Sequence, residues 1–134
     1  MEAFKINRYS VTLESDYGTF TLPFDDAEFL SRYYTAADNC TKYTSQMREQ
    51  LKTIPPNDHK ALAHLTIEAG KYIAGQIDEA IGAGTCAAVF GDATPSIDAC
   101  MEFFAALKPY FEAYEQKRRE FTSRYSADRM GGAV

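Results

Sequence analysis

The stretch Thr19-Phe20-Thr21-Leu22-Pro23-Phe24-Asp25-Asp26 marks the point where the hydrophobic pattern of this chain changes its period. Before it, apolar residues alternate with polar ones, as Phe20 and Leu22 do, which is typical of a half-buried strand. After it, apolar residues recur every three or four positions, which is typical of an amphipathic helix. Pro23 closes the strand pattern. The sequence therefore predicts strands followed by helices.

Three segments before this point carry the strand pattern, at roughly residues 3–6, 9–14 and 19–23. The pattern slips at Asn7-Arg8 and at Ser15-Asp16-Tyr17-Gly18, where Asn and Gly accommodate tight turns. A small isolated sheet is marginal in water, so its apolar face must pack on the helices. The predicted class is α+β, with a small N-terminal antiparallel β-meander of two or three strands followed by a mainly α-helical bundle.

The first helical stripe covers residues 26–54 and is stopped by Pro55-Pro56. Asp25 or Asp26 can cap it, because a short acidic side chain accepts from the free N–H groups of the first turn. Residues 35–44 have low helix propensity, which leaves a break in this helix as an open alternative.

The second helix begins at Asn57 or Asp58, either of which can cap it. Gly70 and Gly75 lie inside this helix, where each costs about 1 kcal/mol relative to alanine. We expect another backbone to approach closely at both positions, since that is the usual reason for glycine within a helix.

The second helix ends in the run Ile77-Asp78-Glu79-Ala80-Ile81-Gly82-Ala83-Gly84. Gly82 and Gly84 can supply the positive φ angles that terminate a helix. Residues 85–90 can form one short helical turn closed by Gly91. The acidic pair lies near a helix C-terminus, where it opposes the helix dipole, so we expect a cation or a loop N–H to bind it.

The last helix is predicted to open at Thr94-Pro95, a cap residue followed by proline in the first turn. Pro109 lies inside its pattern and should kink or split it, because proline lacks the N–H that the helix needs. Residues 126–134 should form a flexible tail. The predicted organisation is a single domain over residues 1–134, made of a meander at 1–24, a helical body at 25–125 and the tail.

Aromatic residues widen the apolar face of this last helix to more than half of its circumference. They either pack on the first two helices as core, or form in part an exposed groove for a partner helix. The residues of this candidate partner-binding surface are Phe103, Phe104, Tyr110, Phe111 and Tyr114.

Composition limits the function. The net charge of −5 argues against nucleic acid as a partner, since phosphate binding needs a concentrated basic surface. The cations near the C-terminus fit a solvated helix end, with an anionic partner as the alternative. The start has no signal-peptide pattern, and no apolar stretch approaches the roughly 20 residues that span a membrane. Three scattered cysteines, Cys40, Cys86 and Cys100, fit reduced core thiols in a cytoplasm.

A search for chemistry finds no complete motif. His59 and His64 are five residues apart and diverge on a helix, so they do not form a metal pair. Gly82-Ala83-Gly84 lacks the Gly-Lys-Ser/Thr of a phosphate loop and follows a helix rather than a strand. Asp78 and Glu79 point to different sides of their helix and cannot act as an acid/base pair. We therefore predict no catalytic residues, no metal site, no cofactor and no enzymatic activity.

Residues 77–111 combine the run Ile77–Gly84, the run Val89-Phe90-Gly91-Asp92 and the aromatic helix Phe103-Phe104-x-x-Leu107-x-Pro109-Tyr110-Phe111. With the strand-like start, this arrangement resembles small proteins of the tail modules of long-tailed bacteriophages and prophages of Gram-positive hosts. Within that group it is most similar to a tail assembly chaperone. The order of elements covers most of the chain, but the long first helix has no counterpart that we can match.

The resemblance implies a protein that binds the helical tape measure protein or tail tube subunits in the bacterial cytoplasm, without a cofactor and without catalysis. It also allows a homo-oligomer. The alternative function is a structural or packaging protein of a phage particle or another macromolecular assembly. A very long coiled-coil gene immediately downstream would favour the chaperone.

Overall fold

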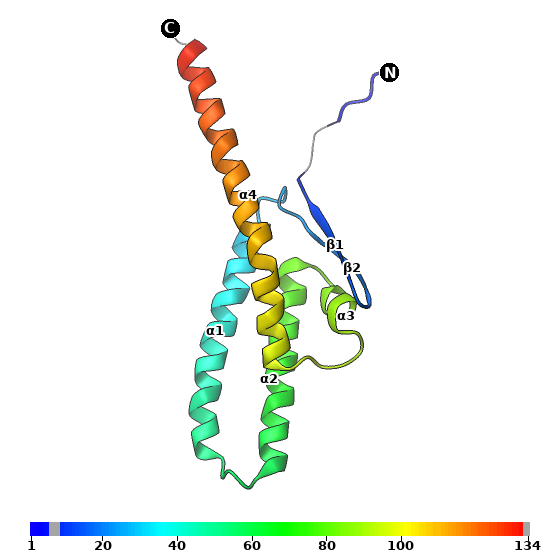
Figure 1. Ribbon diagram of the computed structural model, residues 1–134, viewed down its shortest axis with the longest axis vertical. Helices are drawn as coiled ribbons and strands as arrows, with labels where there is room; N and C mark the ends of the chain where they lie inside the picture. Colours follow the sequence, from blue (N-terminus) through cyan, green and yellow to red (C-terminus); the bar gives the residue numbers. More distant parts are fainter. Residues whose placement is uncertain (6–8, 133–134) are drawn as a thin grey trace. The chain divides into compact units, whose positions relative to one another are not determined.

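The computed structural model describes residues 1–5 and 9–132, with side chains as far as residue 124. The chain consists of two compact units, Met1–Cys100 and Met101–Val134. The α+β class is confirmed, because an antiparallel pair of strands precedes a mainly helical body (Figure 1). The described elements are β1 (Val11–Ser15), β2 (Gly18–Leu22), α1 (Phe29–Thr53), α2 (His59–Ile81), α3 (Thr85–Phe90) and α4 (Ile97–Gly132).

β1 and β2 form a hairpin with Val11 opposite Leu22 and Ser15 opposite Gly18. The turn falls at Asp16-Tyr17, as predicted, and Gly18 has a positive φ of 156°. The outer face is polar, with the hydroxyls of Thr12 and Thr21 2.9 Å apart. Alternation of polar and apolar residues thus decides which face of the hairpin turns toward the helices.

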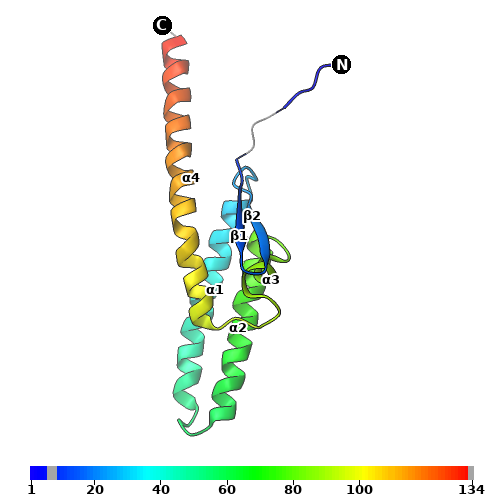
Figure 2. The same cartoon turned by 45° about the vertical axis from the view of Figure 1, so that its right-hand side comes forward.

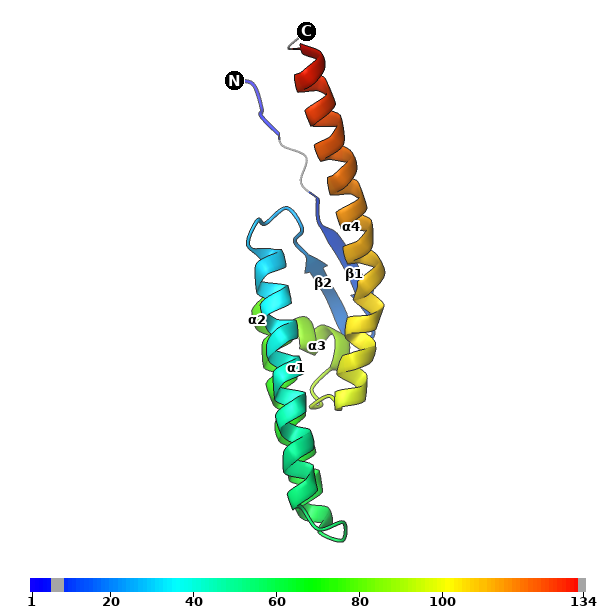
Figure 3. The same cartoon turned by 90° about the vertical axis from the view of Figure 1, so that its left-hand side faces the viewer.

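The third strand of the meander does not form, because Ala3–Lys5 have no strand structure. The predicted turn at Asn7-Arg8 lies outside the described residues. Phe4 is 86% exposed, so pairing this segment with the hairpin would bury little apolar surface. Two strands are sufficient because the hairpin packs on α3, beside which it lies in Figures 2 and 3.

α1 and α2 lie antiparallel and side by side, joined by the Pro55-Pro56 connection (Figure 1). α1 is continuous from Phe29 to Thr53, so the break considered at 35–44 is absent. Burial of Ala36 and Cys40 offsets the low propensity of this region, and the Thr41 hydroxyl donates to the Ala37 carbonyl at 3.0 Å.

The ends of α1 and α2 differ in how they are capped. Asp58 caps α2 as predicted, since its carboxylate accepts from the Ala61 N–H at 3.1 Å. α1 starts later than predicted, and its N-cap residue Glu28 makes no side-chain cap. Asp26 instead accepts from the Glu28 N–H at 3.0 Å, which stabilises the turn before the helix.

The core of the first unit is centred on side chains that are almost completely buried. Phe24 lies after β2 rather than in a strand, and its ring meets that of Phe29 edge-on with centroids 5.5 Å apart. The exposed fractions of Leu22, Phe29 and Ile73 are 0%, and that of Ile77 is 1%. The strand end is thereby tied to both helices of the pair.

α4 begins at Ile97, so the predicted start at Thr94-Pro95 is wrong. The cap is Ser96, whose hydroxyl accepts from the Ala99 N–H at 3.1 Å. The helix continues through Pro109, so the predicted split does not occur, and it continues to Gly132, beyond the expected end at residue 125. A helix of this length can lose one backbone hydrogen bond at proline without ending. Residues 133–134 lie outside the described residues.

Candidate functional site

The segment that joins α2 to α3 has the geometry that its glycines predict. Gly82 and Gly84 have positive φ angles of 151° and 89°, and Gly91, with φ of 72°, closes α3. The Thr85 hydroxyl donates to the Gly82 carbonyl at 2.8 Å. An added Cβ on Gly82 or Gly84 would meet nothing within 4 Å, so backbone conformation rather than space requires glycine there.

Of the acidic pair near the end of α2, Asp78 binds a backbone N–H, one of the two kinds of partner that the sequence analysis considered. The Asp78 carboxylate accepts from the Cys86 backbone N–H at 2.9 Å, which ties the start of α3 to α2. The Cys86 thiol also donates to the Ala74 carbonyl of α2 at 3.3 Å. Asp78 therefore acts as a structural link between two helices.

The two internal glycines of α2 have opposite surroundings. A Cβ on Gly70 would lie 2.1 Å from the Pro95 carbonyl oxygen, so the predicted close approach of another backbone is confirmed there. At Gly75 the prediction is wrong, since nothing lies within 4 Å of the same point. The connection between α3 and α4 thus rests directly on the Gly70 side of α2.

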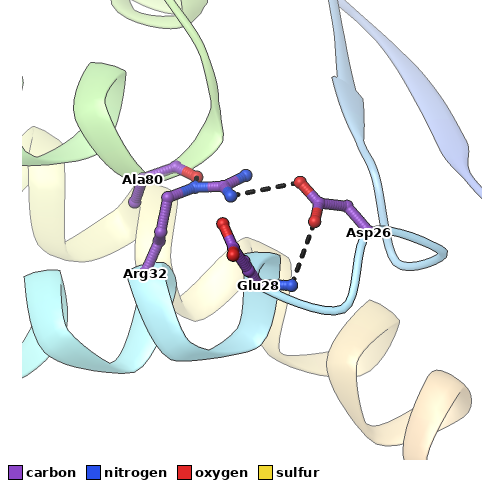
Figure 4. A network of polar contacts seen from close by, with 4 residues as sticks. All are labelled: Asp26, Glu28, Arg32 and Ala80. Carbon is purple, nitrogen blue, oxygen red and sulfur yellow. Dashed lines mark hydrogen bonds and ion pairs between the residues drawn. The ribbon is translucent and has the colours of Figure 1, made fainter.

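A polar network that the sequence analysis did not identify joins the start of α1 to the end of α2 (Figure 4). The Arg32 guanidinium donates from Nη1 to Asp26 at 3.1 Å and from Nε to the Ala80 carbonyl at 3.3 Å. The Glu28 N–H, and after it Arg32, lowers the pKa of the Asp26 carboxyl. The helix dipole favours a cation close to the last carbonyls of a helix. That rule could have led to a search for a residue such as Arg32 beside the end of α2.

Beside this network lies a polar recess of about 210 Å³ between α1 and α2. Asn39 donates to Gln76 across it at 3.0 Å, so amide groups that could bind a ligand already bind each other. The recess is therefore part of the polar contact between α1 and α2. Its lining residues include Ser31, Arg32, Asn39, Gln76 and Glu79.

The three cysteines are free thiols in the core, as predicted. Burial raises the pKa of Cys40 and of Cys100 to about 11. Burial, and after it the nearby Asp78 carboxylate, raises the pKa of Cys86 to about 12. A thiol that stays protonated at neutral pH is a poor nucleophile, so these groups pack rather than react.

The five aromatic residues proposed for partner binding differ in exposure. Phe103 and Phe111 are buried, at 7% and 6% exposed, and Phe104 and Tyr114 are intermediate. Tyr110 is exposed at 37%. The same helix carries Phe121, at 67% exposed, which is not one of the five candidates.

The remaining candidates for chemistry stay apart. His64 lies 3.3 Å from Glu68 on the surface of α2, while His59 begins that helix. No group of three His, Cys, Asp or Glu side chains that could hold a metal occurs among the described residues. Of the cations near the C-terminus, Arg119 lies 3.8 Å from Glu115, and the side chain of Arg129 lies outside the described residues.

None of the helices in the described part of the chain combines the length and the apolar character that a membrane span requires. Comparisons with curated proteins and with solved structures found no match. The profile of one family, described as a family of unknown function, matches residues 18–132, from the start of β2 to the end of α4. The chain belongs to this family, DUF6673.

Proposed function

We propose that this protein is a phage tail assembly chaperone that binds an apolar helical segment of the tape measure protein or of tail tube subunits. The resemblance of residues 77–111 to tail assembly chaperones motivates the proposal, and this segment lies within the range that the family profile matches. In this role the protein works in the bacterial cytoplasm, without cofactor or catalysis.

The proposal rests on the aromatic residues of one side of α4. Tyr110 follows Phe103 by seven residues, Tyr114 follows Tyr110 by four, and Phe121 follows Tyr114 by seven, so all four share that side. The exposed fraction is 7% at Phe103, 37% at Tyr110 and 67% at Phe121, while Tyr114 is intermediate. Large exposed aromatic side chains at helical spacing are typical of surfaces that receive a partner helix.

Co-expression with the neighbouring tape measure gene tests the function. We expect the two proteins to co-purify and the partner's yield in the supernatant to rise. Separate purification with unchanged partner solubility would contradict the chaperone. Recovery of the chain in finished tails or capsids would instead support the structural or packaging alternative, because assembly chaperones leave before completion.

The surface has a matched control on the same helix. Tyr110→Ala and Phe121→Ala should each weaken the complex by about 2 kcal/mol, roughly 30-fold in the dissociation constant. Met101 is also apolar and 40% exposed, but it precedes Tyr110 by nine residues, two and a half turns, and so lies on the opposite side of α4. Met101→Ala should leave the affinity unchanged. Equal losses at Met101 and Tyr110 would place the binding surface elsewhere.

A further inference from the structure

The hairpin leaves the outer side of β1 open to a further strand. β2 is the strand that packs on α3, and β2 lies between β1 and α3 (Figure 2). Residues 1–5 are exposed and have no strand structure, so they do not pair with β1. We define the β1 edge by the backbone N–H and C=O groups of Thr12 and Glu14, which point away from β2.

The register of the hairpin decides which backbone groups point outward. Ser15 lies opposite Gly18 across a two-residue turn, so these two residues exchange both of their backbone hydrogen bonds. Because the kind of pair alternates along the ladder, Thr12 and Thr21 form a pair whose backbone groups face away from the hairpin. The 2.9 Å between their hydroxyls fits this kind of pair, in which side chains lie closer together. No described residue binds the outward groups of Thr12 and Glu14.

β1 lacks the features that usually prevent an edge strand from pairing with another chain. Such features include lysine, proline, an inward-pointing charge and a bulge. None of them occurs in β1, where every residue from Val11 to Ser15 has a consecutive partner in β2. Val11 and Leu13 face the helices but are only half-buried. A further strand beside β1 would cover the open flank of this apolar row.

The charges of the hairpin have one sign. Glu14 lies on the exposed outer face of β1 and Asp16 lies in the turn, and residues 9–22 contain no lysine or arginine. A strand that pairs with the β1 edge places the side chains of its outer face opposite Thr12 and Glu14. Basic residues at these positions are attracted and acidic residues are repelled.

We propose that the β1 edge binds an extended segment of another protein, which adds a third, antiparallel strand to the hairpin. In this segment apolar residues alternate with lysine or arginine. The apolar residues continue the row of Val11 and Leu13, and the basic ones lie on the same face as Glu14. A second copy joined edge to edge is a poor occupant, because its own edge carries the same acidic charge. This inference does not depend on the phage tail proposal.

Three synthetic peptides of about eight residues test backbone pairing with the full chain. All alternate lysine with valine; one is unmodified, one carries N-methyl groups on its central lysines, and one carries them on its central valines. In an antiparallel pair the N–H groups that face β1 belong to the residues opposite Thr12 and Glu14, which are the lysines. Methylation of the lysines therefore blocks pairing, while methylation of the valines leaves it possible without changing the charge.

Fluorescence anisotropy measures the affinities of the three peptides. The unmodified peptide and the valine-methylated peptide should bind saturably, and the lysine-methylated peptide should bind at least about tenfold more weakly. Equal affinities of the two methylated peptides, whether both are high or both are low, would overturn the proposal. Absence of saturable binding by the unmodified peptide would also overturn it.

Two proline variants locate the edge. Thr12→Pro removes a donor from the β1 edge and places a ring against a neighbouring strand, so it should weaken binding about tenfold or more. Thr21→Pro is the control, because it loses the same hydroxyl contact and alters only the outer side of β2. It should stay within about twofold of the parent, and equal losses would overturn the proposal. Circular dichroism and thermal melting check the fold of both variants.

The last arm tests the charge rule and the other occupant, and it does not require the proline variants to fold. Glu14→Lys should weaken binding of the unmodified peptide by about fivefold, and this variant should prefer a peptide with glutamate in place of lysine. Analytical ultracentrifugation of the parent chain should show a monomer at the concentrations of the binding experiment. Unchanged affinity in Glu14→Lys, or a dimer of the parent that Glu14→Lys or Thr12→Pro dissociates, would overturn the proposal.

Discussion

Ile73 and Ile67 lie six residues apart in α2 and have opposite surroundings, since Ile73 is 0% exposed and Ile67 is 46% exposed. Where α3 and the connection that follows it rest on the pair, the apolar face of α2 is closed by backbone contacts such as that of Pro95 with Gly70. Six residues place Ile67 about 120° around the helix from Ile73, outside the buried stripe, and there the same helix offers isoleucine to solvent. The difference shows that the position of an isoleucine around the helix, rather than its residue type, decides whether it is buried.

The largest effect should separate these two isoleucines. Ile73→Ala should lower the free energy of unfolding by about 2–5 kcal/mol, because it leaves a cavity in a fully buried site. Ile67→Ala removes a half-exposed side chain and should cost about 1 kcal/mol or less. Urea denaturation of the two variants measures the difference. Similar losses in both would break the comparison.

Alanine substitutions at the two internal glycines of α2 should change stability by smaller amounts, and in opposite directions. Gly70→Ala should destabilise the fold by about 1–3 kcal/mol, because its Cβ would collide with the Pro95 carbonyl. Gly75→Ala meets open space and should stabilise the helix by up to about 1 kcal/mol. Chemical denaturation gives both values. A stabilising Gly70→Ala would show that the connection to α4 can move away from α2.

The turn that joins α2 to α3 should show a smaller effect. Gly84→Ala forces alanine into a left-handed conformation and should cost about 1 kcal/mol. Gly82→Ala, with φ of 151° and equally open surroundings, should cost a similar amount. If both variants melt at the parental temperature, the turn does not depend on positive φ.

The smallest effect concerns the polar network of Asp26 and Arg32, at the end of the helix pair away from Pro55-Pro56. Asp26 has a pKa lowered in the folded state, so its stabilising effect is present above about pH 4 and is lost as pH falls through the lowered value. Asp26→Asn should therefore be less stable than the parent at neutral pH, with the difference shrinking in acid. A difference that does not depend on pH would exclude the carboxylate charge as its cause.

Local signals in the sequence predicted the elements that depend on neighbouring residues. Alternation of polar and apolar residues predicted the hairpin and its turn. The glycines after Ile81 predicted the end of α2 and the short helix α3. The acidic pair Asp78-Glu79 was expected to bind a cation or a loop N–H, and Asp78 binds the backbone N–H of Cys86 in the first turn of α3.

Contacts between distant residues were not predictable in the same way. Gly70 and Gly75 look alike in sequence, and only the path of the chain after α3 decides which one is contacted. The start of α4 was misplaced because Thr94-Pro95 fits a cap motif while its backbone packs on α2. Of the candidate aromatics, the pattern could not separate the buried Phe103 from the exposed Tyr110, because both lie on one side of α4.

Solution NMR with methyl-labelled isoleucine and leucine, and a soluble paramagnetic agent, tests most directly whether Ile73 and Leu22 are buried while Ile67 and Leu51 are open to solvent. The account predicts strong signal loss for the methyl groups of Ile67 and Leu51, and protection of those of Ile73 and Leu22. Equal protection of all four residues would contradict it, because Ile67 and Leu51 would then be covered in solution.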